Sequence, residues 1–237
     1  MYFQWWIILL GALMIAGYSA IYFLEWKHPL YKLAHINHSY TLWLKGIVNI
    51  VASVVTAWLM AAYLVFVSSY FSGFFAIATT NIWVQRVASF LFLDAIMYWW
   101  HRINHTFPAL WKFHELHHEE KELNVYSTFH FHPKELAIST TWRIILFPLM
   151  GIDPAALLIY EAVFFTTILF HHSNFRLSYF WDKLISIVIV TPGLHHLHHS
   201  VKIEESNSNY GSVFSFWDRI FRSRTIFTTQ PVKYGLK

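Results

Sequence analysis

The sequence contains no cysteine. Disulfides, thiolate zinc sites, iron–sulfur clusters and cysteine nucleophiles are therefore excluded within this chain. Charge is also scarce, because Asp, Glu, Lys and Arg make up 13% of the 237 residues, against about 25% in soluble domains. No run of Lys or Arg forms the basic stripe that nucleic acid requires, so we expect no nucleic-acid partner. Apolar and aromatic residues reach 56% and 20% instead, which predicts a membrane protein.

Five apolar segments predict an all-α integral membrane protein with four or five transmembrane helices. About 20 apolar residues in a helix span the hydrocarbon core of a bilayer. The segments are Trp5–Leu24, Gly46–Val67, Ile82–Trp100, Leu136–Met150 and Pro154–Phe170. The fourth is short and carries Arg143, and Gly151-Ile-Asp-Pro154 is a turn signal before the fifth. Residues Ile185–Val190 are too few to span, which favours an interfacial, re-entrant or strand-like piece.

Basic residues set the expected orientation. Lys and Arg occur in the loops 25–45 and 101–135 and in the tail Val201–Lys237, whereas 68–81 and the turn 151–153 have none. Because basic residues near span ends favour the cytoplasm, we expect the N-terminus outside and all histidine clusters and the C-terminus inside. With no long linker, the chain is predicted to form a transmembrane hairpin region over 1–81. A core with a cytosolic histidine-rich helical cap follows over 82–237, as one integrated domain.

Histidine is abundant where cysteine is absent. Of 16 histidines, 13 lie between His101 and His199, and the pattern HxxHH occurs twice, starting at His114 and His195, after an HxxxH at His101. Helical positions i, i+3 and i+4 share a face, so each pattern directs its imidazoles to one side. Neutral imidazole is the commonest protein ligand of transition metals. One ion takes about four to six ligands, so these three clusters predict two ions.

Two further histidines complete the predicted ligand set. His172 ends the fifth apolar segment at the same membrane face, and His132 lies in Phe131-His132-Pro133. The candidate ligands are His101, His105, His114, His117, His118, His132, His172, His195, His198 and His199. Hydrogen bonding or packing is the simpler role for His130, His171 and His196.

Two acidic residues lie inside predicted spans. Asp94 precedes His101 by seven residues and Glu161 precedes His172 by eleven, so each acid shares a helix face with its histidine. Intramembrane acids are costly and usually mark a functional interior, and metal-ligating imidazoles commonly donate their other N–H to a carboxylate. We therefore expect at least one of the two acids to support a ligand or to lie near the cavity. Pairing with Arg86 or Arg143 is the structural alternative.

An all-imidazole, thiolate-free pair of sites suits iron, copper or zinc. The residues also resemble the fatty acid hydroxylase / sterol desaturase superfamily of integral membrane di-iron oxygenases, in its bacterial-type members. The resemblance covers roughly residues 90–222, and Arg222 and His196 are its modest departures. Beyond the three histidine clusters, it rests on Trp100-His101-Arg102-x-x-His105, Phe131-His132-Pro133, His172-Ser173-Asn174, Val190-Thr191-Pro192, Ser208-Asn209-Tyr210-Gly211 and Trp217-Asp218-Arg219.

This resemblance implies a four-helix membrane core in a bacterial inner membrane, two iron ions, and O2 as co-substrate. By it, the protein is a monooxygenase that hydroxylates or desaturates a lipid C–H bond. Electrons would come from an external donor such as a ferredoxin or a cytochrome b5-like protein. Asn174, two residues after His172, joins Asp94 and Glu161 as a supporting residue, and no catalytic residue is expected beyond the metal centre.

Two other functions remain open at this point. His114-Glu115-x-x-His118 matches the HExxH signature of zinc metalloproteases, with Glu115 as general base, but this leaves the other clusters unexplained. A histidine-based metal or haem binding or transport protein is the second alternative. A transporter places its ligands near the middle of the membrane, whereas these histidines gather at span ends.

Overall fold

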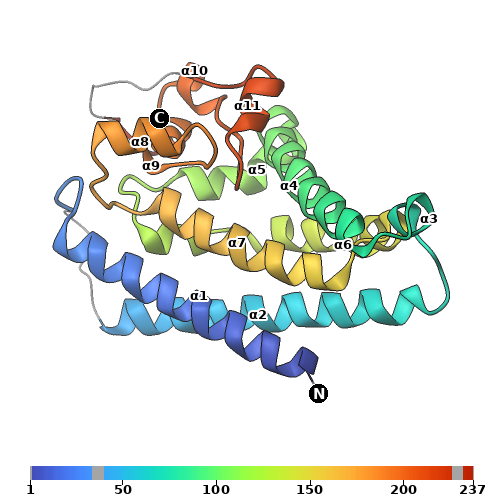
Figure 1. Ribbon diagram of the computed structural model, residues 1–237. Coiled ribbons are helices and arrows are strands. Elements are labelled where there is room, and N and C mark those ends of the chain that lie inside the picture. Colours follow the sequence, from blue (N-terminus) through green and yellow to red (C-terminus); the bar gives the residue numbers. More distant parts are fainter. Residues whose placement is uncertain (1, 34–39, 226–231, 237) are drawn as a thin grey trace.

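The computed structural model describes residues 2–33, 40–225 and 232–236 (Figure 1). Over these ranges the chain is helical, and its β pairing is limited to isolated bridges, which confirms the predicted all-α class. The longer helices are α1 (Tyr2–Lys27), α2 (Tyr40–Ser68), α4 (Ile82–Thr106), α5 (Pro108–His118), α6 (Pro133–Met150) and α7 (Pro154–His172). The shorter elements are α3 (Phe74–Ala78), the 3-10 turn η1 (Val125–Phe129), α8 (Tyr179–Ile185), α9 (Pro192–His198), α10 (Ile203–Ser206) and α11 (Phe216–Ile220).

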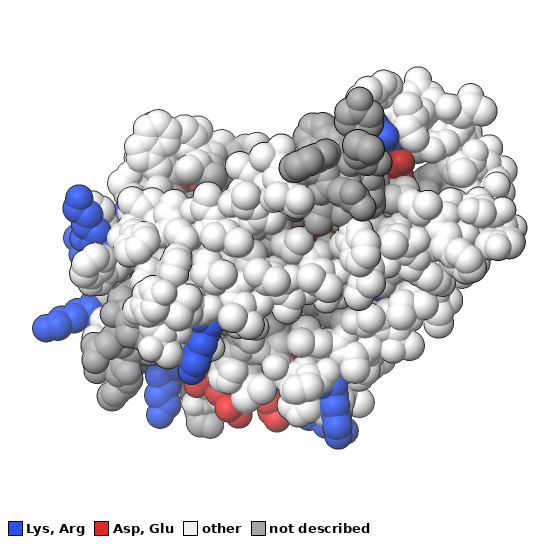
Figure 2. All heavy atoms as spheres, turned by 90° about the horizontal axis from the view of Figure 1, so that it is seen from below, with Lys and Arg blue, Asp and Glu red and all other residues white. Residues whose placement is uncertain are grey.

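The protein is a membrane protein by the length and composition of its helices. Within the described ranges, three helical stretches can cross a bilayer: Ile8–Lys27, Tyr40–Ser68 and Pro154–His172. This is fewer than the four or five predicted. Helices α4 and α6 form over the third and fourth predicted segments, but polar side chains such as Asp94 and Arg143 lower their hydropathy. Figure 2 shows the molecule from the side of α1 and α2. The middle of this face is broad and almost free of charged side chains, which lie mainly at its edges.

Local chemistry sets the helix boundaries around the site. Asn81 is the N-cap of α4, and its side-chain oxygen accepts from the backbone N–H groups of the first turn. Helix α6 ends at Met150 and is followed by Gly151, which adopts φ 68°, a left-handed conformation that costs glycine little. Asp153 then caps α7 by accepting from the Ala156 N–H at 2.8 Å, with Pro154 in the first turn. The predicted turn therefore forms and sets α7 antiparallel to α6.

Helix α7 is the central element of the packing. In Figure 1 it lies between the layer formed by α1 and α2 and the short helices of the cap. It contributes Leu157 and Tyr160 to a core shared with α2, α4 and α6, and Leu169 to a second core shared with α1 and α2. Because both cores contain α7, its C-terminal end, where His172 lies, is held in a fixed position.

The segment before the second HxxHH pattern is strand-like only locally. Helix α8 ends at Ile185, and Ile189 forms an isolated antiparallel bridge with Phe214. The Val190 N–H donates to the Val213 carbonyl at 3.0 Å, so this segment is tied to the C-terminal tail before α9 begins. The predicted loop 25–45 and tail Val201–Lys237 include residues 34–39, 226–231 and 237, which lie outside the described residues.

Candidate metal centre

Four helix ends bring the histidines together. Helix α4 carries His101 and His105 in its last two turns, and α7 ends at His172. Between them in sequence, α5 presents all three histidines of the first HxxHH pattern. After α7, helix α9 carries His195 and His198 of the second pattern, and His199 is its C-cap. The i, i+3, i+4 spacing thus places imidazoles on the inner face of short helices, as the sequence predicts.

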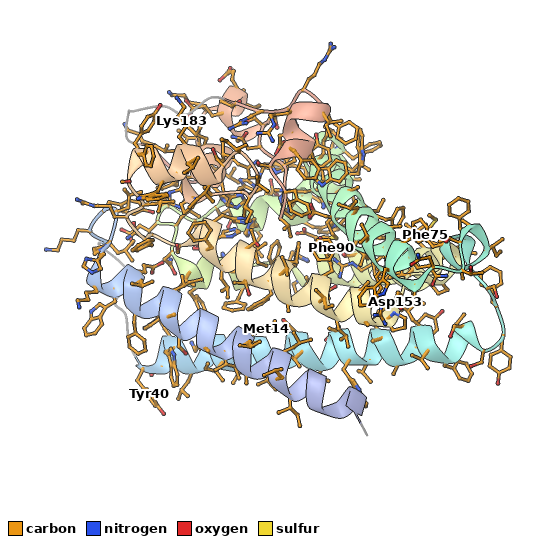
Figure 3. All side chains as sticks on the ribbon, in the orientation of Figure 1. Met14, Tyr40, Phe75, Phe90, Asp153 and Lys183 are labelled. Atoms are coloured by element: carbon orange, nitrogen blue, oxygen red, sulfur yellow. The ribbon has the colours of Figure 1, made fainter. Side chains whose placement is uncertain are left out.

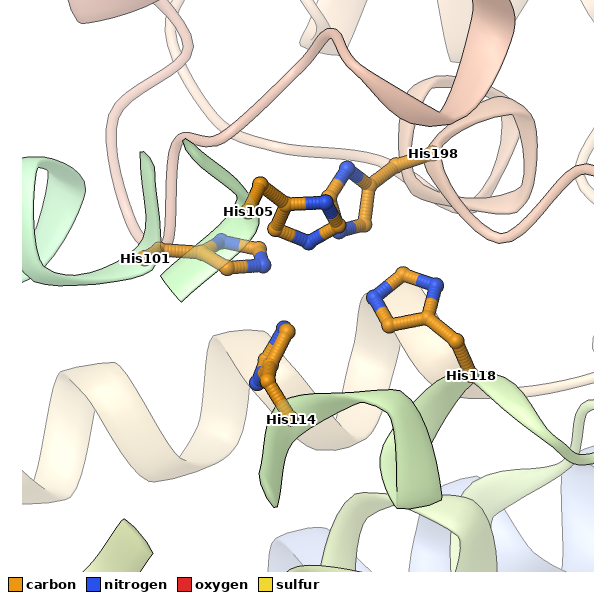
Figure 4. Close-up of side chains that lie close together, drawn as sticks. All are labelled: His101, His105, His114, His118 and His198. Carbon is orange, nitrogen blue, oxygen red and sulfur yellow. The ribbon is translucent and has the colours of Figure 1, made fainter. Parts of the chain in front are cut away.

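Nine of the ten predicted ligands fall into two groups. Each histidine offers one ring nitrogen as a candidate ligand atom, and within each group these nitrogens all lie within 4.8 Å of one another. Figure 4 shows the rings of the first group around a common space. The first group, site A, is His101, His105, His114, His118 and His198. The second group, site B, is His117, His172, His195 and His199.

Helix α5 contributes to both sites. His114 and His118 belong to site A and His117 to site B, although all three share one turn of helix. The rings of His118 and His199 stack across the two sites with centroids 4.3 Å apart. The two sites are therefore neighbours, as a dinuclear centre requires.

In site B, four Nε2 atoms lie close to one another. His172 Nε2 lies 3.0 Å from both His117 Nε2 and His195 Nε2, and His195 Nε2 lies 3.1 Å from His199 Nε2. The other nitrogen of His172 donates to the Ile168 carbonyl at 2.8 Å, and that of His117 to the His130 carbonyl at 3.3 Å. With Nδ1 protonated, the neutral rings of His117 and His172 point lone pairs at each other. A cation between them removes that repulsion.

Site A has the same arrangement of donors. His101 Nδ1 donates to the Tyr210 carbonyl at 3.0 Å and His198 Nδ1 to the Ser208 carbonyl at 2.7 Å. His114 Nδ1 donates to Glu135 Oε1 at 2.9 Å. Across the part of the chain that the structure describes, no hydrogen-bond partner is found for the buried Nε2 atoms of His105, His114, His118 and His198. Buried polar atoms rarely lack a partner, and a metal ion fits these free acceptors.

The surroundings keep these imidazoles neutral. Burial lowers the pKa of His117, His118, His195 and His199 well below 6.5, and that of His198 to about 3. The neighbouring imidazoles lower it further, since a second positive charge nearby disfavours protonation. The neutral form is the one that binds a metal, so the site is prepared for metal at ordinary pH.

Glu135, which was not predicted, supports a ligand directly. It is buried at the first turn of α6, and its carboxylate accepts from His114. The signal was present in the sequence, because Glu135 follows Phe131-His132-Pro133 within one helical turn. Pro133 at the helix start fixes the entry of α6, and thereby the direction of the Glu135 side chain.

The predicted supporting acids act elsewhere. Asp94 accepts from the Val213 and Phe214 N–H groups at 3.2 and 3.1 Å and from Trp217 Nε1 at 2.8 Å. It therefore anchors the tail rather than an imidazole, contrary to the prediction that it supports a ligand. Glu161 lines the cavity, as the second part of that prediction expected, and lies 3.7 Å from Arg143.

Asn174 is also not a partner of an imidazole. Its side chain accepts from the Tyr31 N–H at 3.2 Å and donates to the Tyr31 carbonyl at 2.8 Å. The Asn174 N–H donates to Glu25 at 2.8 Å, and Glu25 also accepts from the Val125 N–H at 2.7 Å. Asn174 thus ties the chain after α7 to the end of α1, two residues from His172.

His132 lies outside both sites. Its Nδ1 accepts from the Lys134 N–H at 3.0 Å and caps α6, and its ring packs on Phe113 with centroids 5.1 Å apart. The prediction of a tenth ligand at His132 is therefore corrected, because the ring is turned to the helix start.

The three histidines for which hydrogen bonding or packing was the expected role also lie outside both sites. His130 pairs with Glu120 at 2.9 Å, His171 packs on His195, and His196 contacts the Tyr234 hydroxyl at 3.1 Å.

The tail positions the carbonyls that hold site A. Asp218 accepts from the Tyr210 and Gly211 N–H groups at 2.7 and 2.9 Å and from the Ser223 hydroxyl at 2.7 Å. Tyr210 and Ser208 then present their carbonyls to His101 and His198. The motifs Ser208–Gly211 and Trp217–Arg219 were visible in the sequence, but this role depends on backbone atoms, which side-chain spacing does not reveal.

A cavity of about 490 Å³ leads from the membrane helices to the metal sites. Its far part is lined by apolar residues of α1, α2 and α7, including Met14, which Figure 3 labels. At the other end it reaches rings of both sites, including His101 and His172. Glu115 does not line it. The arrangement suits a hydrophobic molecule with one end at the imidazoles.

The family comparison agrees with this geometry. The model of the fatty acid hydroxylase family matches residues 86–223, more than half of the chain and all nine histidines of the two sites. The chain belongs to the fatty acid hydroxylase family. This confirms the resemblance noted in the sequence and shows an oxidoreductase embedded in a membrane. No solved structure matches the chain.

Proposed function

We propose that this fatty acid hydroxylase family member uses two iron ions and O2 to hydroxylate or desaturate a lipid C–H bond. One observation carries the proposal: two adjacent all-imidazole sites lie at the end of an apolar cavity. Ligands of this kind suit iron, and the absence of thiolates argues against a structural zinc site. Family membership supports the same reaction class.

Sites A and B would each hold one ion, and the pair of ions would supply the reduction of O2 and the oxidising power for the C–H bond. The residues of the chain orient and insulate this chemistry. The carbonyls of Tyr210, Ser208, Ile168 and His130 hold one tautomer of their imidazoles. The apolar cavity walls exclude water and position the lipid. No side chain needs to act as nucleophile.

The partners follow from the composition. A chain without cysteine has no iron–sulfur cluster of its own, so electrons would come from a separate donor, such as a ferredoxin or a cytochrome b5-like protein. The lipid would enter from the bilayer. We place the protein in a bacterial inner membrane with its N-terminus outside and the two sites on the cytoplasmic side, because the basic loops favour that orientation.

Metal content and O2 uptake test the proposal, with a matched pair of neighbouring histidines. The wild-type protein should hold two iron ions per chain and consume O2 only when reductant is supplied. His195→Ala removes a site B nitrogen and should lose iron and O2 uptake, whereas His196→Ala, outside both sites, should keep both. Zinc as the bound metal, or O2 uptake that ignores reductant, would contradict the proposal.

The product is found by comparing lipids of cells with and without the gene. A lipid that gains one oxygen indicates hydroxylation, and one that loses two hydrogens indicates desaturation. Glu115→Gln excludes the protease alternative. A metalloprotease loses nearly all activity without this general base, whereas an oxygenase should keep its metal and most of its turnover, since Glu115 does not line the cavity.

A further inference from the structure

A pair of opposite charges lies in the cavity away from the metal sites. Arg143 of α6 and Glu161 of α7 both line the cavity, and Arg143 Nη1 is 3.7 Å from Glu161 Oε1. Their side chains are only 21% and 25% exposed. Charges placed within a membrane protein are costly and usually mark a functional interior. The pair therefore calls for an explanation beyond packing.

The hydrogen-bonding capacity of Arg143 is largely unused. A guanidinium has five N–H donors. Nη2 donates to Met97 Sδ at 2.8 Å, which is a weak acceptor, and the buried Nε has no partner in the described part of the chain. The contact with Glu161, at 3.7 Å, is longer than a hydrogen bond. Arg143 can thus donate to a ligand without giving up a strong bond.

Several other polar side chains of the cavity are already satisfied. Asn49, Ser53, Thr56 and Thr140 each donate to a carbonyl one turn earlier in their own helix. Such local bonds leave them little gain from a bound molecule. Other buried polar atoms without a partner in the cavity wall, such as Glu135 Oε2 and His171 Nδ1, belong to residues that contact the imidazoles of the two sites. Away from that end of the cavity, Arg143 and Glu161 therefore form the place where a polar group of a ligand gains most.

We propose that Arg143 and Glu161 bind the hydroxyl group of a hydrophobic alcohol. Its oxygen accepts from the guanidinium while its O–H donates to the carboxylate, so one neutral group satisfies both charges. A carboxylate ligand is disfavoured because Glu161 already provides a negative charge beside Arg143. A plain hydrocarbon offers no hydrogen bond to either the Arg143 guanidinium or the Glu161 carboxylate. This inference rests on the proposed function and specifies its substrate class.

The position of the pair also fixes where oxidation occurs. Arg143 lies eight residues along α6 from Glu135, which holds His114, and this corresponds to about 12 Å of helix. Glu161 lies eleven residues before His172 on α7, about 16 Å. The bound hydroxyl would therefore be far from the imidazoles. The carbon that is oxidised would lie toward the end of the lipid alcohol opposite its hydroxyl group.

Binding to the metal-free protein tests the inference without any turnover. The protein in detergent is titrated with 1-hexadecanol, hexadecane and palmitate, and tryptophan fluorescence reports binding. Wild-type protein should bind 1-hexadecanol about tenfold more tightly than hexadecane, the value of one charge-assisted hydrogen bond, and should discriminate against palmitate. Equal binding of alcohol and hydrocarbon would overturn the proposal.

Two variants separate the charges. Arg143→Met should remove the preference for the alcohol while hexadecane still binds, which shows that the cavity has folded. Glu161→Gln leaves the cation unbalanced and should shift the preference to palmitate. Arg176→Met, which removes an exposed cation outside the cavity, should match wild type. The proposal fails if Arg143→Met keeps the alcohol preference or Glu161→Gln gains no palmitate binding.

The failure of this inference and the failure of the proposed function give different results. A protein that binds two iron ions but shows no alcohol preference retains its proposed function and loses this inference. A protein that prefers the alcohol through Arg143 but takes up no iron retains the binding site and loses the proposed reaction.

Discussion

At the scale of single residues, the site depends on which nitrogen of each imidazole is free. Backbone carbonyls fix this for His101, His117, His172 and His198, whereas for His114 a carboxylate does so. A carboxylate makes its imidazole a stronger ligand than a carbonyl does, because the negative charge raises the basicity of the ring. Glu135 is thus the most sensitive supporting residue of site A.

We expect Glu135→Gln to lower the metal affinity of site A by about 10–100-fold, the usual cost of losing such a partner. Metal bound after dialysis against a chelator series measures this, and circular dichroism should remain unchanged. Glu119→Gln, an exposed acid one residue after α5, is the matched control and should bind metal as wild type does. Equal affinity in the two variants would show that Glu135 does not support the ligand.

Helix rise explains why Asp94 does not support a ligand. Asp94 and His101 share a helix face, but seven residues separate them by about 10 Å along the axis, beyond the reach of a carboxylate. Asp94 instead meets the tail, at Val213, Phe214 and Trp217. Periodicity gives the direction of a side chain and not its distance from a partner. The close contacts of the site come from other segments, and one-dimensional spacing does not show them.

At the scale of elements, the membrane helices were predictable and the short helices less so. The polar loop expected over 101–135 contains helix α5, which begins at Pro108. Hydropathy identifies helices that lipid surrounds, whereas a short helix is stabilised mainly by its tertiary packing. The HxxHH spacing nevertheless gave the correct face of α5, since all three of its histidines enter site A or site B.

The contact between α1 and α2 supplies an element-scale prediction. A Cβ at Gly46 would lie 2.0 Å from the hydroxyl oxygen of Tyr18, which is fully buried. Gly46→Ala must therefore displace the buried Tyr18 ring or push the two helices apart, at a cost of about 1–3 kcal/mol. Gly11→Ala is the control at the same interface, because its Cβ would make an ordinary contact of 3.6 Å with Val54.

Thermal unfolding followed by tryptophan fluorescence measures the difference. We expect Gly46→Ala to unfold several degrees below wild type, since about 1 kcal/mol shifts Tm by about 2–4 °C in a domain of this size. Gly11→Ala should stay within a degree or two. A Gly46→Ala protein as stable as the Gly11→Ala protein would show that Tyr18 can move aside at no cost.

At the scale of the whole molecule, the absence of cysteine makes the orientation directly measurable. Any cysteine introduced by mutation is the only thiol of the chain. Ser69, just after α2, and Glu204, in α10 of the cap, are both exposed. The proposed orientation places the first outside the cell and the second, together with the metal sites, in the cytoplasm.

A membrane-impermeant maleimide should therefore label Ser69→Cys in cells whose outer membrane has been made permeable while the inner membrane stays sealed. Glu204→Cys should react only after the inner membrane is opened as well. The physical reason is the distribution of Lys and Arg, which favour the cytoplasmic side because they are retained there during insertion. Labelling of Glu204→Cys in sealed cells would reverse the orientation. It would place sites A and B on the outer face, where a cytoplasmic electron donor has no access. The reversed orientation would therefore also contradict the proposed electron donor.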